Sequence, residues 1–235
     1  ENNMEQIQAK SLEMAEYFVE FCNEHNLLCY LCGGGAIGSL RHGGFIPWDD
    51  DLDFFMPRKD YEKLAKLWPQ EAKYQYFMSK SNYKFVDRNL FITIRETTCV
   101  KPYQVDLDLP HGLALDVIPL DYYPKKKSDR KKQVIWALIY SLFCAQTVPE
   151  KHGGIMSLGS KVLLGVIRGK KLRYKIWKKA EKEMTKYTKE DSDGITELCS
   201  GPFYMKKKYP IEAFESNIMV PFEDTKMPIP VGYDA

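Results

Sequence analysis

Apolar residues recur at intervals of three and four along the first 25 residues of the chain. Ile7, Phe18 and Cys22 belong to this series, and acidic residues and lysine lie between its members. This period places the apolar residues on one face of an α-helix. Residues 4–25 are therefore predicted to form an amphipathic helix.

Short apolar runs separated by turn residues follow the first helix. They predict a buried strand at 27–31, a glycine turn at 33–35, a short helix at 36–42, a strand at 51–55 and a helix at 58–68. Further strands are predicted at 74–78, 89–94, 98–101 and 113–119, with a loop at 104–111. The short spacings between the later strands favour antiparallel pairing.

The pattern changes at Lys125. A basic segment (125–132) and an apolar segment (134–148) precede a long lysine-rich helical stretch (157–187), which is predicted to bend near Gly165 or Gly169. The tail from Glu197 returns to short strand-like pieces with several prolines. These changes predict a core over 1–124, a helical subdomain over 125–190, and a segment over 191–235 that returns to the core. The native chain is expected to continue beyond this segment.

Composition and charge are those of a globular protein without a bulk attraction to nucleic acid. Apolar residues make up 44% of the chain, and 34 basic and 32 acidic side chains leave a net charge of +2. Nucleic acid is therefore not an expected partner. The longest apolar run, 134–148, is too short to cross a bilayer, and the N-terminus does not resemble a signal peptide.

The six cysteines are scattered, and only Cys29 and Cys32 form a C-x-x-C pair. A zinc site needs a second ligand pair, and a redox pair usually opens a helix after a strand. This pair instead lies within an apolar run, so both residues are interpreted as buried core cysteines. Reduced cysteines favour a cytoplasmic protein.

Four aspartates fall within five residues at Asp49, Asp50, Asp51 and Asp53. A solvated acidic loop fits poorly beside the apolar residues that follow. A calcium-binding EF-hand frame fails because Phe54 stands where the frame requires glycine. Clustered carboxylates need a compensating positive charge, and Mg²⁺ or Mn²⁺ supplies it with the oxygen ligands it prefers. Strand alternation puts Asp51 and Asp53 on one face, so these two are the predicted ligands, and their two neighbours shape the loop.

A third carboxylate is available at Asp116, a lone acid in the apolar segment 113–119. A buried unpaired acid is costly, so it is expected to face a cation. Three converging aspartates could hold metal on either side of a phosphorus. A structural aspartate that caps a turn or pairs with an arginine is the alternative.

Other residues near these acids suit an anionic substrate. The glycine turn Gly33–Gly35 can direct backbone N–H groups at phosphate oxygens, although it is neither a Walker motif nor a G-x-G-x-x-G motif. Arg41 is a candidate phosphate contact, and a surface ion pair is the alternative.

The stretch Tyr30–Asp53 has the sequence YLCGGGAIGSLRHGGFIPWDDDLD, which resembles the signature of LicD-type phosphotransferases. That family includes bacterial phosphocholine transferases and fukutin-related ribitol-phosphate transferases. The segment DVIPLD at Asp116–Asp121 resembles the family's second block, and the pieces VPFE and IPVGYD near the end of the chain resemble its third. The chain departs from the family at Cys32, where an acid is frequent, and at Gly35, where Thr or Ser is frequent.

The resemblance implies an α+β fold: a nucleotidyltransferase-like mixed sheet flanked by helices, with an inserted helical subdomain. It implies that Asp51 and Asp53 bind a metal ion and that Asp116 is the third ligand or the base. The implied substrate-binding residues are Gly33, Gly34, Gly35, Ser39, Arg41, Trp48 and Arg95, of which Arg95 is a second candidate phosphate contact. An implied choline head group would need an aromatic cage, for which Trp48, Tyr122 and Tyr123 are candidates; core or rim aromatics are the alternative.

The reaction implied by the resemblance is transfer of a phospho-alkyl group, most simply phosphocholine, from a CDP-linked donor such as CDP-choline. The acceptor would be a hydroxyl of a cell-surface glycan or teichoic-acid precursor, and CMP would be released. A nucleotidyltransferase and a non-catalytic glycan- or lipid-binding module are the alternatives. Lipid-linked acceptors also suggest a peripheral contact at the inner face of the membrane, made by the basic segments 125–132 and 168–179; a solvated helix face is the alternative.

Overall fold

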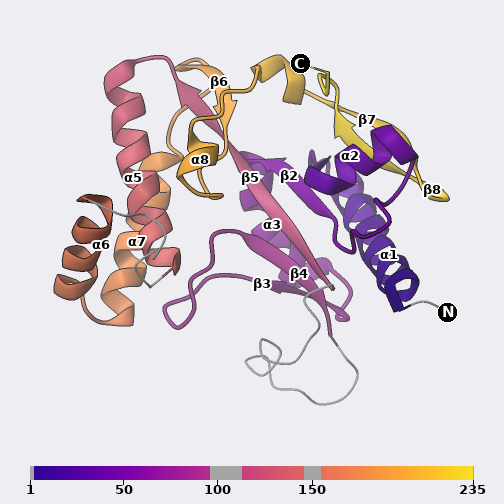
Figure 1. Cartoon of the computed structure of the whole chain (residues 1–235), viewed down its shortest axis with the longest axis horizontal. Coiled ribbons are helices and arrows are strands. Elements are labelled where there is room, and N and C mark those ends of the chain that lie inside the picture. Colours follow the sequence, from indigo (N-terminus) through magenta and orange to yellow (C-terminus); the bar gives the residue numbers. More distant parts are fainter. Residues whose placement is uncertain (1–2, 96–112, 146–154, 235) are drawn as a thin grey trace. The chain divides into compact units, whose positions relative to one another are not determined.

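The structure, a computed structural model, describes residues 3–95, 113–145 and 155–234 (Figure 1). The chain divides into two compact units. Unit 1 comprises residues 1–79, 90–119 and 212–235, and unit 2 comprises 80–89 and 120–211. The segment boundaries at 124 and 190 that the sequence suggests stay predictions.

Unit 1 contains the N-terminal and C-terminal parts of the chain. Its elements are α1 (Asn3–Glu24), β1 (Tyr30–Cys32), α2 (Gly33–His42), β2 (Asp53–Pro57), α3 (Arg58–Glu71), β3 (Tyr76–Ser79), β4 (Leu90–Ile94), the first part of β5 (Ala114–Pro124), β7 (Asn217–Phe222) and β8 (Thr225–Pro230). The 3₁₀ helix η1 (Ile211–Phe214) lies just before the terminal hairpin that β7 and β8 form.

Unit 2 is mostly helical. Its elements are the end of β5, α5 (Lys127–Ala145), α6 (Ile155–Val166), α7 (Lys170–Met184), β6 (Ser192–Thr196) and α8 (Pro202–Met205). Tyr140 of α5 stacks on Trp177 of α7 with their ring centroids 5.0 Å apart. Gln133, which is fully buried, donates to the carbonyls of Tyr122 and Met184 and so ties β5, α5 and α7 together.

Among the described residues, six strands form one sheet in the order β1-β2-β5-β4-β3, with β6 paired to the end of β5. The pairs β1–β2, β3–β4, β4–β5 and β5–β6 are antiparallel. The antiparallel pairing expected for the later strands is therefore confirmed for β3, β4 and β5. The expected fold class is also confirmed, since the chain is α+β with a mixed sheet flanked by helices.

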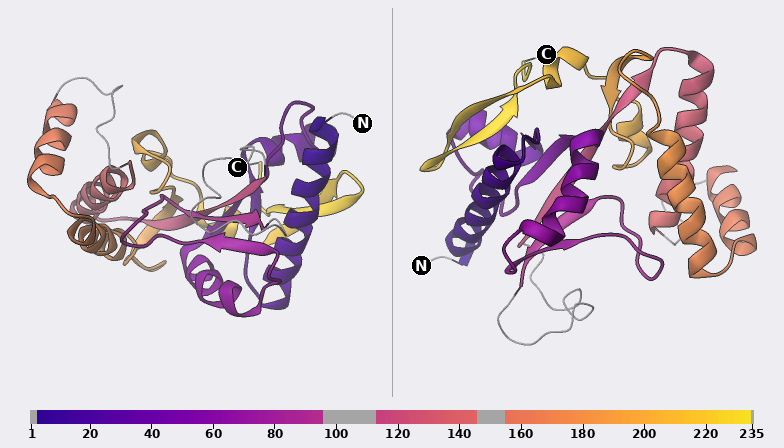
Figure 2. Two further views of the ribbon diagram at one scale, coloured as in Figure 1. Left: turned by 90° about the horizontal axis from the view of Figure 1, so that it is seen from below. Right: turned by 180° about the vertical axis from the view of Figure 1, so that it is seen from behind.

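Strands β2 and β5 bury alternate residues in unit 1. Phe54 and Met56 of β2, and Leu115 and Val117 of β5, are at most 2% exposed, whereas Asp53 and Asp116 alternate with them. Helix α3 lies against one face of the sheet (Figure 2). Phe18 of α1 packs on Phe54 and on Trp68 of α3, at centroid distances of 4.9 and 6.1 Å. The apolar residues therefore face the helices, and the acids point the other way.

Most predicted elements exist, with shifted ends. The helices expected at 4–25 and 58–68 are α1 and α3, and the expected bend of the stretch 157–187 is a break at Gly169, whose φ is 95°. The glycine turn expected at 33–35 is not separate from the next helix, because these residues form the first turn of α2; the positive φ expected there occurs at Gly33, with φ 59°. The glycines there permit close packing: a Cβ at Gly35 would overlap Leu31. The strand expected at 98–101 and the loop at 104–111 lie outside the described residues.

Two smaller expectations concern the strand at 51–55 and the cysteines. The strand begins two residues later than expected, so Asp51 lies in the loop before β2. Cys29 and Cys32 are buried, and neither forms a disulfide, as predicted. In the described ranges, no helix combines the length and apolar character needed to cross a bilayer.

Phe18 is fully buried between β2 and α3, so Phe18→Ala is expected to leave a cavity and lower the free energy of unfolding by about 3–5 kcal/mol. Phe203, which is 66% exposed, is the matched control, and Phe203→Ala should cost less than about 0.5 kcal/mol. Urea denaturation followed by circular dichroism measures both. Equal costs for the two variants would contradict this description of the core.

Candidate active site

A sharp reversal after α2 begins the loop that carries the acids. Gly43 ends the helix with φ 65°, a left-handed conformation that favours glycine, and its N–H donates to the Ser39 carbonyl at 3.0 Å. A Cβ at Gly38 would overlap the carbonyl oxygen of Gly44. Close contact between α2 and the returning chain therefore depends on glycine at position 38.

Helix α1 holds the end of this loop. Gln8 donates from Nε2 to the carbonyl of Asp49 at 2.7 Å, and Ser11 donates from Oγ to the carbonyl of Asp50 at 2.8 Å. Both acceptors are main-chain atoms, so the bonds fix the path of the loop and leave the carboxylates of Asp49 and Asp50 available. Ser11 is 3% exposed.

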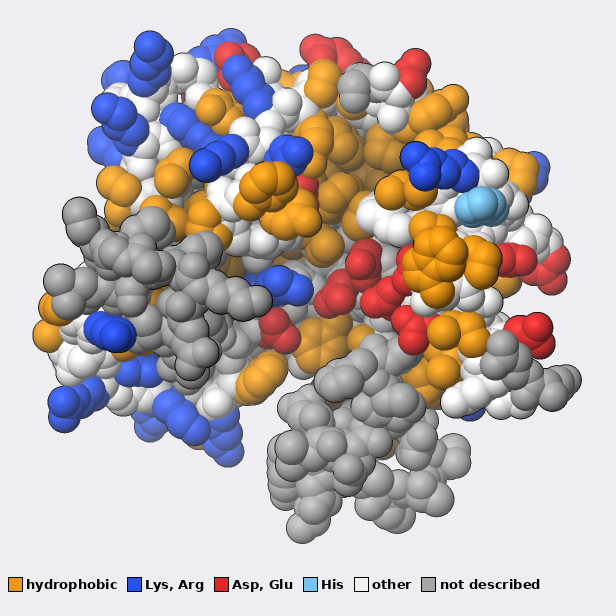
Figure 3. Space-filling model, in the orientation of Figure 1, with side chains coloured by type: hydrophobic (Ala, Val, Ile, Leu, Met, Phe, Trp, Pro, Cys, Tyr) orange, Lys and Arg blue, Asp and Glu red, His pale blue; other side chains and the backbone are white. Residues whose placement is uncertain are grey.

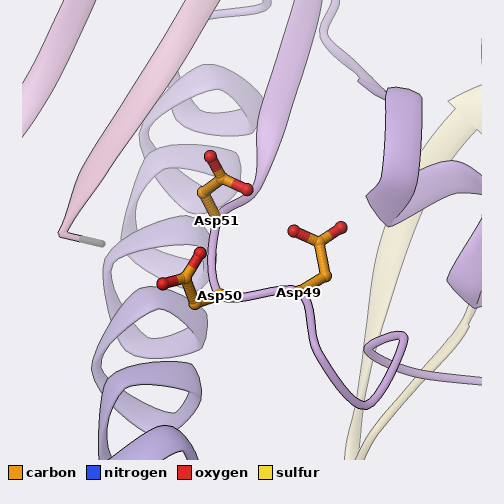
Figure 4. Close-up of side chains that lie close together, drawn as sticks. All are labelled: Asp49, Asp50 and Asp51. Atoms are coloured by element: carbon orange, nitrogen blue, oxygen red, sulfur yellow. The ribbon is translucent and has the colours of Figure 1, made fainter. Parts of the chain in front are cut away.

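Asp49, Asp50 and Asp51 project to the same side of the loop (Figure 4). One oxygen from each lies within 4.8 Å of the others, a spacing suited to a metal ion. A Cβ at Gly34 would overlap the Asp49 carboxylate, so the first turn of α2 and this carboxylate are in close contact. The sequence pattern assigns Asp49 and Asp50 only to shaping the loop; their spacing makes both candidate ligands as well.

Asp53 and Asp116 lie on neighbouring strands, β2 and β5, on the sheet face opposite the apolar core. The Asp53 carboxylate accepts a hydrogen bond from the backbone N–H of Asp116. Its Oδ1 is buried and has no hydrogen-bond partner among the described residues. The structure therefore brings together Asp53 and Asp116, which are 63 positions apart in the sequence (116 − 53).

The carboxylates disfavour one another's charged forms. Burial raises the pKa of Asp53 to about 7, and the charges of Asp116, Asp51 and Asp49 contribute to the increase. Burial, then the hydrogen bond and charge of Asp49, raise the pKa of Asp51 to about 6, with smaller effects from Asp50 and Asp116. The charge of Asp116 raises the pKa of Asp51, and the charge of Asp51 raises the pKa of Asp53. The three predicted ligands therefore form one electrostatic cluster.

Acidic side chains lie next to one another on the visible face in Figure 3. Arg95 directly follows β4 and is four residues after Phe91, which pairs with Asp116 of β5. Its guanidinium lies over the rings of Tyr74 and Phe77, 4.2 and 4.6 Å from their centroids. Its Nε is buried without a hydrogen-bond partner among the described residues.

The other predicted substrate-binding residues differ in exposure. Arg41 in the last turn of α2 is exposed, and Trp48 beside the acids is 78% exposed. Ser39 is buried, and its hydroxyl donates to the carbonyl of Pro221 at 3.1 Å. A substrate contact for each of these residues, and for Gly33, Gly34 and Gly35 in the first turn of α2, stays a prediction.

Residues 26–140 match the family model described as "LicD/FKTN/FKRP, nucleotidyltransferase domain". This range includes Asp51, Asp53 and Asp116. The chain carries a LicD-family domain.

Three relatives illustrate what the LicD domain is similar to. A lipopolysaccharide cholinephosphotransferase LicD of Haemophilus influenzae is 42% identical over 67 residues, which are 28% of this chain and 25% of that protein. Mannosyltransferase regulator 4 of Saccharomyces cerevisiae is 24% identical over 170 residues, 71% of this chain and 14% of that protein. An uncharacterised protein of Rickettsia prowazekii is 26% identical over 106 residues, 45% of this chain and 37% of that protein. The chain therefore spans well under half of each relative.

The acid cluster of the LicD domain fits a hard divalent cation. Every candidate ligand is a carboxylate oxygen, which Mg²⁺ and Mn²⁺ prefer. The Oδ1 of Asp53, which has no partner in the part of the chain that the structure describes, and the raised pKa values of Asp51 and Asp53 mark uncompensated negative charge. A bound cation would remove this penalty by favouring the ionised carboxylates.

Sequence reasoning missed the residues that hold the acid loop. Gln8 and Ser11 are three positions apart on α1, and Ser11 occupies a place in the buried series that continues with Met14, Ala15 and Phe18. A serine within an apolar helix stripe is a signal that a buried partner exists. The sequence does not identify that partner, because the Asp50 carbonyl is a main-chain group 39 positions away from Ser11.

Two glycine substitutions distinguish the effect of moving the Asp49 side chain from the effect of disturbing the packing of the loop. In Gly34→Ala the new Cβ meets the end of a side chain, so Asp49 is expected to turn away, with a stability change under about 1 kcal/mol and a loss of Mn²⁺ affinity of about tenfold or more. In Gly38→Ala the Cβ meets backbone, so we expect a cost of about 1–3 kcal/mol. Thermal unfolding and Mn²⁺ titration measure both.

Gly165→Ala is the control for the glycine pair, because nothing lies within 4 Å of a Cβ there and its φ is not in the left-handed region. It should change neither Mn²⁺ affinity nor, by more than about 1 kcal/mol, stability. Unchanged Mn²⁺ affinity in Gly34→Ala would show that Asp49 does not contribute to the site.

Asp53→Asn tests the charge cluster in the metal-free protein. The folded-state pKa of about 7 lies above the ordinary value of 3.8, so the folded protein binds more protons between these values and loses stability as pH rises through this window. Removing the charge should raise the free energy of unfolding at pH 8 by about 1–3 kcal/mol and flatten this loss, since one pKa unit corresponds to about 1.4 kcal/mol.

Chemical denaturation at pH 5 and pH 8, with chelator and then with Mg²⁺, measures the effect. Mg²⁺ should stabilise the natural protein more at pH 8 than at pH 5 and should stabilise Asp53→Asn little. Asp193→Asn, which changes an exposed acid, is the control. A metal-free Asp53→Asn variant that is less stable than the natural protein at pH 8 would refute the repulsion.

Proposed function

We propose that this chain is a metal-dependent phosphotransferase that moves a phospho-alkyl group, most simply phosphocholine, from a CDP-linked donor to a hydroxyl and releases CMP. The observation that carries the proposal is the LicD-family match over 26–140, in which Asp51, Asp53 and Asp116 form one electrostatic cluster. The name of the Haemophilus relative, a cholinephosphotransferase, supports phosphocholine as the transferred group.

Asp51, Asp53 and Asp116 would hold Mg²⁺ or Mn²⁺, with Asp49 and Asp50 as neighbouring carboxylates. The bound ion would neutralise the diphosphate of the donor and stabilise charge that develops on the leaving oxygen. Gln8 and Ser11 would keep the loop in place by binding its carbonyls. The carboxylates would then already be in position when the substrate binds, so binding would not have to order the loop.

In the proposed reaction, the oxygen of the acceptor hydroxyl attacks the phosphorus that carries the choline group. The bond between that phosphorus and the oxygen it shares with CMP breaks, and CMP leaves with this oxygen. The hydroxyl proton passes to a carboxylate, for which Asp116 is our candidate. The products are CMP and a phosphodiester on the acceptor, so atoms and charge balance.

Other residues of the domain would orient the donor. Arg95 offers a buried guanidinium nitrogen without a protein partner among the described residues, which suits a phosphate oxygen. Arg41 and the backbone N–H groups of Gly33–Gly35 would contact the same diphosphate. The ring of Trp48 is free to stack on a trimethylammonium group. Tyr123 suits that role less, because Arg130 already lies 4.0 Å from its ring centroid.

A glycan acceptor carried on a lipid would bring the protein to the inner face of a membrane. Within unit 2, Val162 and Val166 of α6 are 56% and 76% exposed, and Arg168 and Lys170 follow at once. Apolar side chains beside basic ones suit an anionic lipid surface. A peripheral membrane contact is therefore part of the proposal.

A second candidate is true nucleotidyl transfer, which the description of the matching family domain favours. Attack on the other phosphorus of CDP-choline would move CMP to the acceptor and release phosphocholine. The same carboxylates would serve both reactions, so the products alone distinguish them. A non-catalytic binding module predicts neither product.

The test is incubation with CDP-choline, Mg²⁺ and a glycan acceptor, with CMP and phosphocholine measured by chromatography. Asp51→Asn, Asp53→Asn and Asp116→Asn are each expected to reduce CMP release by more than about 100-fold, because each removes a charged ligand or the base. The exposed control Asp193→Asn should retain activity. Chelator should abolish the reaction, and Mg²⁺ should restore it.

CMP on the acceptor with free phosphocholine would replace the first proposal by the second. No turnover of CDP-choline, CDP-ribitol, CDP-ethanolamine or CDP-glycerol would favour the binding module. Turnover of one of the other donors would correct the head group and keep the reaction class. Full activity of all three Asn variants would remove the proposed site.

A further inference from the structure

Glu223 occupies an unusual backbone conformation in the turn between β7 and β8. Its φ is 53°, one of two positive values among the described non-glycine residues. Tight hairpin turns with positive φ favour glycine or asparagine, and a longer side chain there costs roughly 1–2 kcal/mol. Glutamate at this position indicates that its side chain makes a compensating contact.

The compensating contacts are with the start of the acid loop. The backbone N–H of Glu223 donates to the Gly43 carbonyl at 2.6 Å, and its Oε1 accepts from the N–H of Phe45 at 2.9 Å. A Cβ at Gly44 would overlap the Glu223 carboxylate. The side chain therefore fills the space that Gly44 leaves and binds Phe45, while the backbone N–H of Glu223 binds Gly43 on the other side.

Neighbouring contacts join the same two segments. The rings of Phe45 and Phe222 meet edge to face with centroids 5.0 Å apart, and Phe222 is fully buried. Ser39 donates to the Pro221 carbonyl. Three consecutive residues of the hairpin therefore contact α2 or the loop that follows it.

The loop has only a short path from Glu223 to the acids. Phe45 is followed by Ile46, whose carbonyl accepts from the N–H of Asp49 at 2.9 Å and closes a tight turn. Gln8 binds the Asp49 carbonyl at the other end of this turn. A shift of Phe45 would therefore move the carbonyl that holds Asp49.

We propose that Glu223 is a positioning residue for the acid cluster. From the turn of the C-terminal hairpin it fixes the start of the loop, so that Asp49, Asp50 and Asp51 are presented together. The hairpin is thereby a required part of the site, although it lies about 170 residues further along the chain (223 − 51 = 172). This inference rests on the proposed function only in treating the acids as a metal site.

Two measurements test the proposal on the whole chain. Hydrogen exchange by mass spectrometry reports the loop 43–52, and Mn²⁺ titration followed by electron paramagnetic resonance reports the acids without any need for turnover. Glu223→Ala is expected to speed exchange in 43–52 about tenfold or more and to weaken Mn²⁺ binding about tenfold, while α3 exchanges as before.

Three further variants separate the side-chain contact from other effects. Glu223→Gln keeps an acceptor for the Phe45 N–H and should restore Mn²⁺ affinity to within about threefold of the natural protein. Glu223→Gly relieves the backbone conformation but lacks the acceptor, so it should weaken Mn²⁺ binding as alanine does. Asp224→Ala, next to Glu223 in the same turn, should change neither measurement.

If hydrogen exchange in residues 43–52 of the Glu223→Ala variant is as slow as in the natural protein, the proposed contact is overturned. Faster exchange with unchanged Mn²⁺ affinity would overturn its link to the acids, and faster exchange throughout α3 would assign Glu223 to general stability. If the natural protein binds Mn²⁺ but transfers nothing from any CDP-linked donor, the proposed function fails and the positioning role stands. If it binds no Mn²⁺, the metal site fails and the positioning role fails with it.

Discussion

The LicD domain holds several carboxylates close together, in the loop before β2 and on the sheet face opposite the apolar core, and their mutual repulsion is the constraint on which the site depends. Burial and neighbouring charges raise the pKa of Asp53 to about 7 and that of Asp51 to about 6. Without other contacts, the carboxylates of this loop would separate, because separation and hydration both lower their electrostatic energy. Other contacts in the fold must therefore hold the loop in place.

The fold holds the loop through its main chain. Gln8 and Ser11 bind carbonyls of the acids themselves, Glu223 binds the N–H of Phe45, and glycine at position 38 lets α2 approach the returning chain. None of these contacts uses a carboxylate of the acid loop. The side chains therefore remain available for a cation, and the energy of the packed core offsets their repulsion.

Local pattern predicted the elements well and the site in part. Alternation selected Asp51 and Asp53 among the four clustered acids, Asp116 was identified as a lone acid in an apolar segment, and apolar spacing located α1 and α3. The separate glycine turn was wrong because these glycines begin α2: Gly33 has a positive φ and Gly34 and Gly35 permit close packing, which a local turn rule does not distinguish. The predicted strand also began two residues before β2. Asp51 and Leu52 continue the alternation of polar and apolar residues, but they do not belong to the paired strand.

What the sequence could not supply are contacts between main-chain atoms and side chains far away along the chain. The Ser11 hydroxyl and the Asp50 carbonyl leave no paired signal, because every residue has a carbonyl. Glu223 likewise looks like an ordinary acid in a hairpin turn until its positive φ and the space above Gly44 are known. A motif can thus identify the residues that carry charge, whereas the residues that hold them in place follow only from the folded chain. A LicD-type motif without such supports would identify the acids and leave their arrangement undetermined.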